Sequence, residues 1–151
     1  MIEVADVLGL DASLGRELAV SEWMEVPQSR IDRFASATAD EQWIHVDPSR
    51  AAKESPYGAP IAHGFLTLSL MPALLRSAVT FPRVRMAINY GLNRVRFVSA
   101  VPSGARIRAR FTPIAVTPLN GQVDVIWAVT VERDGGDKPC CVAEWVARYF
   151  V

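Results

Sequence analysis

The stretch Thr38–Pro48, TADEQWIHVDP, contains Asp40 and, five positions later, His45, one of only two histidines in the chain. A carboxylate raises the proton affinity of a neighbouring imidazole, and such a pair takes up and returns protons near neutral pH. On one continuous helix the two side chains would lie roughly 140° apart, so they converge only if the chain turns after Asp40. Pro48 favours such a turn, because it disfavours a helical conformation at Asp47. The spacing by itself favours a simpler alternative, a surface turn with a capping aspartate and a solvated histidine.

The second histidine, His63, precedes Gly64 at the point where a loop enters an apolar segment. The first turn of a helix leaves backbone N–H groups unpaired, and the helix dipole adds partial positive charge there. Glycine lets a ligand approach that backbone closely. Such an N–H stabilises a carbonyl oxygen that gains negative charge, as an oxyanion hole does. Taken alone, however, a glycine at a helix start is ordinary, and His63 is more simply a loop anchor.

Helices are predicted to position these residues in the first half of the chain. Ile31, Phe34 and Ala35 have helical spacing, with Ser29 as a candidate N-cap. The run FLTLSLMPALLRSAV is apolar on nearly every side, which indicates a buried helix, and its internal Pro72 predicts a kink or a break. We expect a short strand over residues 21–26, helices over 27–40, 49–54 and 65–79, and a loop over 55–64.

The second half of the chain is typical of β-strands. Four segments rich in valine, isoleucine and aromatic residues are separated by the turn sequences SAVPSG, PLNG and RDGGDK. The strands are expected over residues 85–98, 105–117, 122–134 and 138–151. A meander that follows one buried helix predicts an α+β fold, in which a curved antiparallel sheet wraps around the helix. No repeat or linker divides the chain, so we expect a single domain over residues 1–151.

The composition argues against several classes of partner. Lysine plus arginine and aspartate plus glutamate both total 16, so a net charge of zero gives no attraction to nucleic acid or to an anionic membrane. No apolar run approaches the roughly 20 residues that span a bilayer, and the N-terminus lacks the pattern of a signal peptide. The only cysteines, Cys140 and Cys141, are adjacent and poorly suited to a mutual disulfide. We therefore expect a cytoplasmic protein without nucleic-acid or membrane partners.

The segments FASATADEQWIHVDPSRAA and GAPIAHGFLTLSLMPALL together resemble the MaoC-like dehydratases, the family of (R)-specific enoyl-CoA hydratases with the hot-dog fold. The family motif has an aspartate five residues before a histidine, and then a loop that ends in Ala-His-Gly. Asp40, His45 and the AHG of residues 62–64 match it. The resemblance covers about residues 22–151. QWIHVDP and INYGLNRVRF are most similar to the branch of nodulation protein N, which includes mycobacterial-type single-domain hydratases.

The resemblance implies reversible hydration of a trans-2-enoyl-CoA to an (R)-3-hydroxyacyl-CoA. In this reaction Asp40 and His45 hold the water, and the Gly64 N–H receives the thioester oxygen. Which member of the dyad removes the proton stays open. The coenzyme A thioester is the substrate, and no separate cofactor is expected. The side chains expected to contact the substrate are Gln42, His63, Asn89 and Asn93, the last two sharing one face of a regular strand.

Three positions depart from the family motif. Ala39 stands in place of the glycine before the aspartate and restricts the turn there. Gln42 replaces an asparagine and Trp43 a proline, and these two changes bear on the placement of the water and on the substrate range.

Two other functions fit the same fold. A hot-dog thioesterase typically uses a carboxylate from the central helix, and FLTLSLMPALL contains none. A non-enzymatic acyl-CoA or acyl-carrier binding module has no need of an intact acid–histidine pair. The side chains of Asp40, His45, Asp47 and His63 are of metal-ligating types, but their spacing matches no metal signature, so we expect no metal. We expect a homodimer, because a single sheet of this kind has exposed edges and a low net charge favours self-association.

Overall fold

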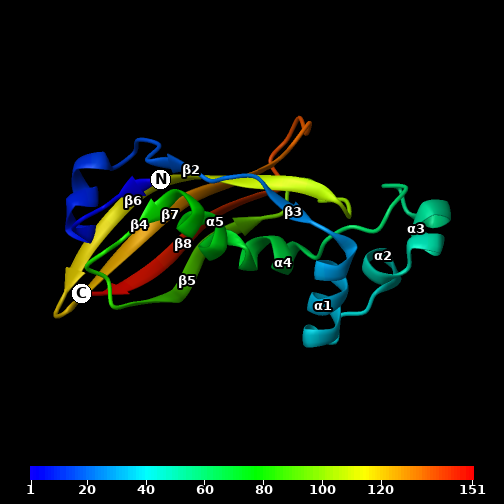
Figure 1. The fold of residues 1–151 in the computed structure, drawn as a ribbon, viewed down its shortest axis with the longest axis horizontal. Coiled ribbons are helices and arrows are strands. Elements are labelled where there is room, and N and C mark those ends of the chain that lie inside the picture. The colour runs from blue at the N-terminus through cyan, green and yellow to red at the C-terminus, as the bar shows by residue number, and fades with distance from the viewer.

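A six-stranded antiparallel sheet forms the body of the protein in the computed structural model, which describes residues 1–151 (Figure 1). The strand order is β2–β6–β7–β8–β5, and β3 also pairs with β6. The strands are β2 (Ala19–Val20), β3 (Met24–Val26), β5 (Met86–Arg96), β6 (Ala105–Leu119), β7 (Gln122–Arg133) and β8 (Cys141–Phe150). Near the N-terminus, β1 (Ile2–Glu3) pairs in parallel with β4 (Val79–Thr80), and a 3-10 helix covers Val7–Ser13.

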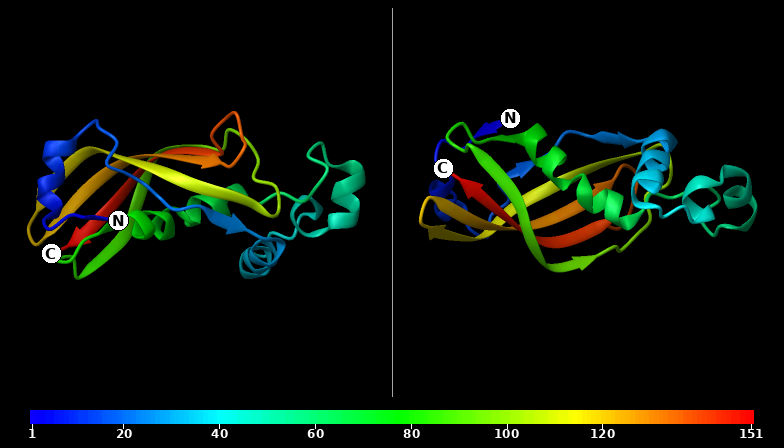
Figure 2. Two further views of the ribbon diagram at one scale, coloured as in Figure 1. Left: turned by 45° about the horizontal axis from the view of Figure 1, so that its top comes forward. Right: turned by 90° about the horizontal axis from the view of Figure 1, so that it is seen from below.

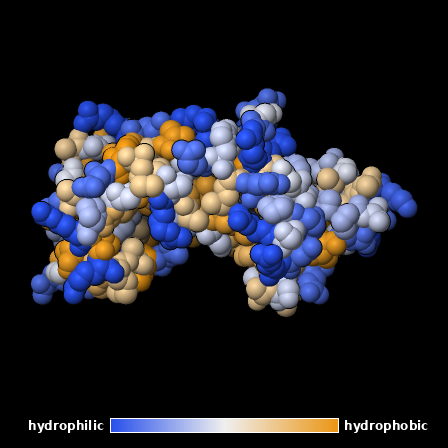
Figure 3. Space-filling view, viewed as in Figure 1, coloured by the Kyte–Doolittle hydropathy of each residue, from blue (hydrophilic) through white to orange (hydrophobic).

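Two consecutive helices, α4 (Gly64–Ser69) and α5 (Met71–Ala78), run along one face of the curved sheet (Figure 2). Three further helices, α1 (Gln28–Thr38), α2 (Trp43–Val46) and α3 (Pro48–Glu54), lie at one end of the molecule and project beyond the sheet (Figure 1). The space-filling view shows the same division into a sheet body and a projecting helical part (Figure 3). None of the helices is long and apolar enough to cross a membrane.

The core lies between the sheet and α5. Alternate residues of β7 and β8 are buried, as expected for strands that present one face to a helix. The buried side chains of α5 include Met71, Leu74 and Leu75, and they join Trp127 and Phe111 of the sheet in one cluster of 27 residues. This α+β architecture, with a curved antiparallel sheet around a central helix, confirms the fold predicted from the sequence.

Two local predictions need correction. Ser29 is not the N-cap of α1, because the helix already begins at Gln28 and Pro27 occupies the cap without a side-chain hydrogen bond. The strand β5 is not regular: its register against β8 shifts between Asn89 and Gly91, and again between Leu92 and Arg94. By contrast, the break predicted at Pro72 is present, since α4 ends at Ser69 and α5 carries the proline in its first turn.

Candidate active site

A left-handed residue turns the chain from α1 towards α2. The helix α1 ends at Thr38, and Ala39 follows it with φ 58° and ψ 22°. Ala39 is the only residue other than glycine with a positive φ. The helix therefore ends two residues earlier than the sequence suggested, and Asp40 lies after the turn, exposed at the surface. This reversal removes the 140° separation that a continuous helix would have imposed.

His45 lies in the short helix α2 and is only 8% exposed, so the alternative of a solvated histidine is wrong. Its ring Nδ1 is 2.7 Å from the backbone carbonyl oxygen of Ile61. Because a carbonyl can only accept a hydrogen bond, Nδ1 carries the hydrogen. In the neutral ring Nε2 then has a free lone pair, and His45 is held in the tautomer that accepts a proton at Nε2.

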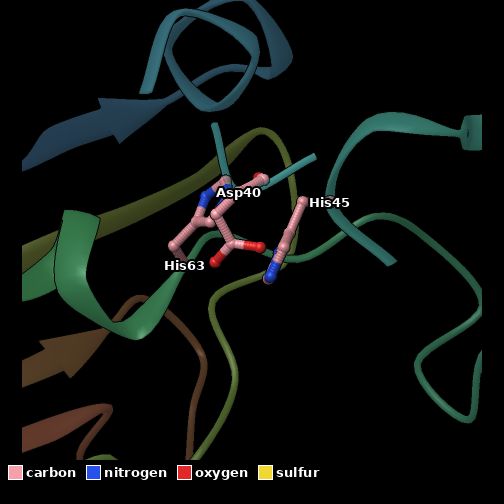
Figure 4. A group of neighbouring side chains, drawn as sticks. All are labelled: Asp40, His45 and His63. Carbon is pink, nitrogen blue, oxygen red and sulfur yellow. The ribbon is translucent and has the colours of Figure 1, made fainter. Parts of the chain in front are cut away.

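Asp40 and both histidines meet in one cluster, although they come from three different segments of the chain (Figure 4). One potential ligand atom from each of the three side chains lies within 4.8 Å of the others. The rings of His45 and His63 are stacked, with centroids 3.7 Å apart and an angle of 22° between their planes. The Nε2–H of His63 donates to the backbone carbonyl of Asp40 over 2.8 Å. The carboxylate of Asp40 points towards the His45 ring (Figure 4).

The surroundings lower the pKa of His45 below its usual value. Burial is the largest cause, because it disfavours the charged imidazolium, and the neighbouring His63 acts in the same direction. The hydrogen bond to Ile61 and the charge of Asp40 oppose this effect without cancelling it. At neutral pH the ring is therefore predominantly uncharged, which is the state that a proton acceptor requires.

Gly64 is the first residue of α4, and its backbone N–H has no hydrogen-bond partner within the protein. The Phe97 ring, which follows β5, packs directly over the α-carbon of this glycine. A β-carbon at position 64 would lie 2.7 Å from Cδ2 of Phe97. Both residues line a pocket of about 230 Å³ that also contacts Thr67 and Val98. A side chain at position 64 therefore cannot be accommodated without moving the aromatic ring.

The residues predicted to bind substrate lie in different places. Gln42 is an exposed N-cap of α2, and its side chain makes no hydrogen bond to the dyad. Asn89 pairs with Ala147 on the inner face of the sheet and lines two pockets between α4–α5 and the β5–β8 strands. Asn93 lies at the second register shift of β5 and lines neither of these pockets, so the two asparagines do not share a surface.

The geometry of the cluster does not suit a single metal ion. Zinc ligands converge on the ion at about 2.0–2.2 Å. The nearly parallel rings of His45 and His63 instead direct their lone pairs along separate planes. One nitrogen of each ring also faces a backbone carbonyl. Asp47, the remaining candidate ligand, accepts a hydrogen bond from the Arg50 N–H and caps α3. The arrangement fits proton transfer better than metal binding.

Sequence reasoning missed several residues of the site. Ile61 acts through its backbone carbonyl, which leaves no signal in the residue type. Gln28 donates to the carbonyl of His45 over 2.7 Å and to Asp32 over 2.8 Å, and thereby ties α1 to α2. Phe97 follows the alternating part of β5 and reads as one more strand residue. Its contact with Gly64 depends on the path of the chain after the strand, which no local pattern indicates.

The sequence and the fold both resemble known proteins. The model of the MaoC like domain matches residues 10–134. The chain is 48% identical to 3-hydroxyacyl-thioester dehydratase Z of Mycobacterium tuberculosis over 144 residues, 95% of each chain. It is 45% identical to nodulation protein N of Rhizobium leguminosarum bv. viciae, covering 96% of this chain and 89% of that one.

A solved structure extends the likeness to the fold. The R-hydratase PhaJ1 of Pseudomonas aeruginosa superposes with a TM-score of 0.71 at 22% identity, covering 90% of this chain and 82% of that one. The family model spans most of the chain, the named relatives match nearly its whole length, and the sheet wrapped around a central helix is shared. The chain therefore belongs to the MaoC-like dehydratase family and has the hot-dog fold.

Proposed function

We propose that the protein catalyses the reversible hydration of trans-2-enoyl-CoA to (R)-3-hydroxyacyl-CoA. The observation that carries this proposal is the state of His45: it is buried, held with a free Nε2 lone pair, and placed beside the carboxylate of Asp40. A water between these two groups is activated without a metal or another cofactor. The name of the 48% identical relative, a 3-hydroxyacyl-thioester dehydratase, supports the same type of reaction.

The proposed mechanism divides the work among three groups. His45 Nε2 takes a proton from the water as the water oxygen forms a bond to C3 of the enoyl thioester. The Asp40 carboxylate orients the water and stabilises the imidazolium that forms. The unpaired N–H of Gly64 donates to the thioester oxygen while enolate character develops. A proton from the dyad then goes to C2, so that the elements of one water are added across the double bond.

An apolar channel along the central helices is the proposed site of the acyl chain. Leu68 follows Gly64 by four residues in α4, and Leu75 follows Pro72 by three residues in α5, so each pair lies on one side of its own helix. Leu68 and Pro72 line a pocket of about 190 Å³, and Pro72 and Leu75 line a neighbouring one of about 460 Å³. Both pockets also contact Trp145 of β8. Their lengthwise arrangement suits an extended alkyl chain.

The two alternative functions, a thioesterase and a non-enzymatic binding module, receive less support. No acidic residue lies in α4 or α5, which weighs against a thioesterase that uses a carboxylate from the central helix. A binding module without activity would not require the proton-accepting form of His45 to be fixed by a backbone carbonyl. Coenzyme A as the carrier is what the family resemblance implies, and the cytoplasmic location stays a prediction from the sequence.

The decisive test offers crotonyl-CoA and longer 2-enoyl-CoAs to the purified protein and follows the loss of the conjugated thioester absorbance. Analysis of the product on a chiral column should show the (R)-3-hydroxyacyl thioester. Release of free coenzyme A without hydration would indicate a thioesterase instead. An (S) product, or binding without turnover for every chain length, would contradict the proposal.

The dyad is tested by two variants of nearly unchanged shape. Asp40→Asn removes the charge, and His45→Gln removes the imidazole, so each change should abolish nearly all of kcat. The double variant should lose little more than either single one, because effects within one catalytic unit are not additive. Substrate binding, measured by calorimetry with a saturated acyl-CoA, should be retained in all three. Hydration by Asp40→Asn at close to the native rate would exclude Asp40 from the reaction.

A further inference from the structure

His63 makes more contacts with the dyad than a loop anchor requires. It is the N-cap residue of α4 and is 2% exposed. Its Nε2–H donates to the backbone carbonyl of Asp40 over 2.8 Å, a bond that joins segments 23 residues apart. Its ring is stacked on that of His45. The ring of Phe34 from α1 also packs against it, with centroids 4.9 Å apart. One side chain thus contacts both Asp40 and His45.

The other ring nitrogen of His63 has no partner within the protein and carries a cost to stability. Because Nε2 of His63 carries the hydrogen that it donates, Nδ1 has a lone pair, and this buried atom has no hydrogen-bond partner. A buried acceptor without a partner lowers the stability of the folded protein, because it has lost its hydrogen bond to water. Such a cost is expected where the arrangement of a group serves the reaction.

The hydrogen bond from His63 to the Asp40 carbonyl holds a residue that few other contacts fix in place. The left-handed Ala39 precedes Asp40, and the exposed side chain of Asp40 makes no hydrogen bond within the protein. The carbonyl bond from His63 is therefore a direct link between the residue that carries the carboxylate and the start of α4. Since α4 also supplies the Gly64 N–H, His63 connects all three proposed catalytic groups.

We propose that His63 is a positioning residue for the dyad: its Nε2–H fixes the backbone of Asp40, and its ring face fixes the ring of His45. This inference rests on the proposed hydratase function. It differs from substrate binding, the role that the family resemblance suggested for His63. A positioning residue acts on kcat, because a displacement of about 1 Å in the reacting groups costs on the order of a hundredfold in rate.

The two contacts can be separated by substitution. His63→Gln places an amide nitrogen near the position of Nε2 and keeps the bond to Asp40, but it removes the ring. His63→Asn is the matched control, since its shorter amide cannot reach the carbonyl. We expect kcat for crotonyl-CoA to fall about 10- to 100-fold in His63→Asn and to be restored at least partly in His63→Gln, with KM changed little in both.

A second readout does not depend on turnover. The chain has only two histidines, so each His63 variant leaves His45 as the only one, and its signal in an NMR titration of the untagged protein is identified directly. Asp40 and His63 are the titratable groups that act on His45, and His63 lowers the pKa of His45. Both variants should therefore raise the pKa of His45, and the acid limb of the kcat/KM profile should move to higher pH with it.

The outcomes separate this inference from the proposed function. An inactive wild-type protein would refute the hydratase function, and this inference with it. An active wild type whose His63→Asn variant keeps the native kcat and the native His45 titration would refute the positioning role alone. A rise in KM at unchanged kcat would assign His63 to substrate binding instead. Thermal melting checks that the variants fold, and rescue by His63→Gln distinguishes a lost bond from a general loss of stability.

Discussion

At the scale of single residues, the site depends on how the environment of His45 sets its charge. Its pKa lies below the usual value of about 6.5, chiefly because the ring is buried. The proposed general base is active when neutral. The acid limb of kcat/KM for hydration should therefore have a midpoint below about 6.5, and activity should fall as the pH falls through it. A rate profile from pH 5 to pH 8 checks this. An acid limb centred above 7 would exclude a buried His45 as the base.

The same shift affects stability with a defined sign. Between the lowered pKa of folded His45 and the unfolded value of about 6.5, the unfolded chain binds more protons, so the free energy of unfolding rises with pH across that window. His45→Gln removes this contribution. Urea unfolding at pH 5 and pH 7 should show a smaller pH dependence in the variant than in the wild type.

The space for a side chain at position 64 is limited by the Phe97 ring as well as by the proposed substrate. A β-carbon there would overlap the Phe97 ring, so even Gly64→Ala must displace the ring, and Gly64→Val should lower kcat by about a hundredfold or more. The same Gly64→Ala change should have a smaller effect in a Phe97→Ala background, because the obstacle is gone. Equal effects in both backgrounds would show that the ring is irrelevant and that the β-carbon interferes with the substrate directly.

At the scale of elements, the left-handed Ala39 ends α1 at an energetic cost. A residue with a β-carbon in this conformation costs roughly 1–2 kcal/mol. Glycine avoids this strain, but its greater freedom in the unfolded chain offsets part of the gain in stability. Ala39→Gly should therefore raise the free energy of unfolding by up to about 1 kcal/mol. Ala37→Gly, at an exposed position in the last turn of α1, should lower it, by less than the roughly 1 kcal/mol of a helix interior. Chemical denaturation of the two variants would show opposite signs.

The channel along α4 and α5 predicts a residue that limits acyl chain length. Leu68 lies four residues after Gly64, about 6 Å along the helix axis. An extended chain advances roughly 1.2 Å per bond, so this distance corresponds to about five bonds. Leu68→Trp should fill the channel at that point. The kcat/KM value for crotonyl-CoA should change little, while that for 2-decenoyl-CoA should fall at least tenfold. A parallel loss for both substrates would place the acyl chain elsewhere.

The sequence predicted the helices and strands better than the turns and contacts that connect them. Periodicity predicted the four long strands and the buried helical segment, whereas the Asp40–His45 pair was identified by the family resemblance and not by its spacing alone. Local patterns could not show that Ala39 turns left-handed, since alanine rarely does so. They also could not show the two irregularities of β5, because these are shifts in its register against β8, and the register depends on the partner strand. The stacking of the two histidines depends on the path of the loop before α4, a long-range feature.

At the scale of the whole molecule, the outer edge of β5 is the part of the sheet that has no partner in a monomer. It is the last strand of the sheet and pairs only with β8, so the backbone groups along its other edge have no strand partner. Four of its large apolar side chains are at least 40% exposed, namely Met86, Ile88, Tyr90 and Leu92. Hydrophobic surface is visible over this part of the sheet body (Figure 3). Exposed edges of this kind are normally covered or paired.

We expect a second copy of the chain to pair with this edge. In a two-fold symmetric dimer, β5 of one protomer would extend the sheet of its partner, and the same apolar residues would face each other. Lysines introduced together at Met86 and Ile88 would place like charges on both sides of that contact. Sedimentation velocity at micromolar concentration should show a dimer for the wild type and a monomer for this variant.

The matched control introduces lysines at Ile114 and Leu119 of β6, which are similarly exposed but distant from β5 in the strand order, and it should stay dimeric. A wild-type protein that sediments as a monomer would exclude the dimer, and dissociation of the control variant instead would move the interface to the β6 side of the sheet.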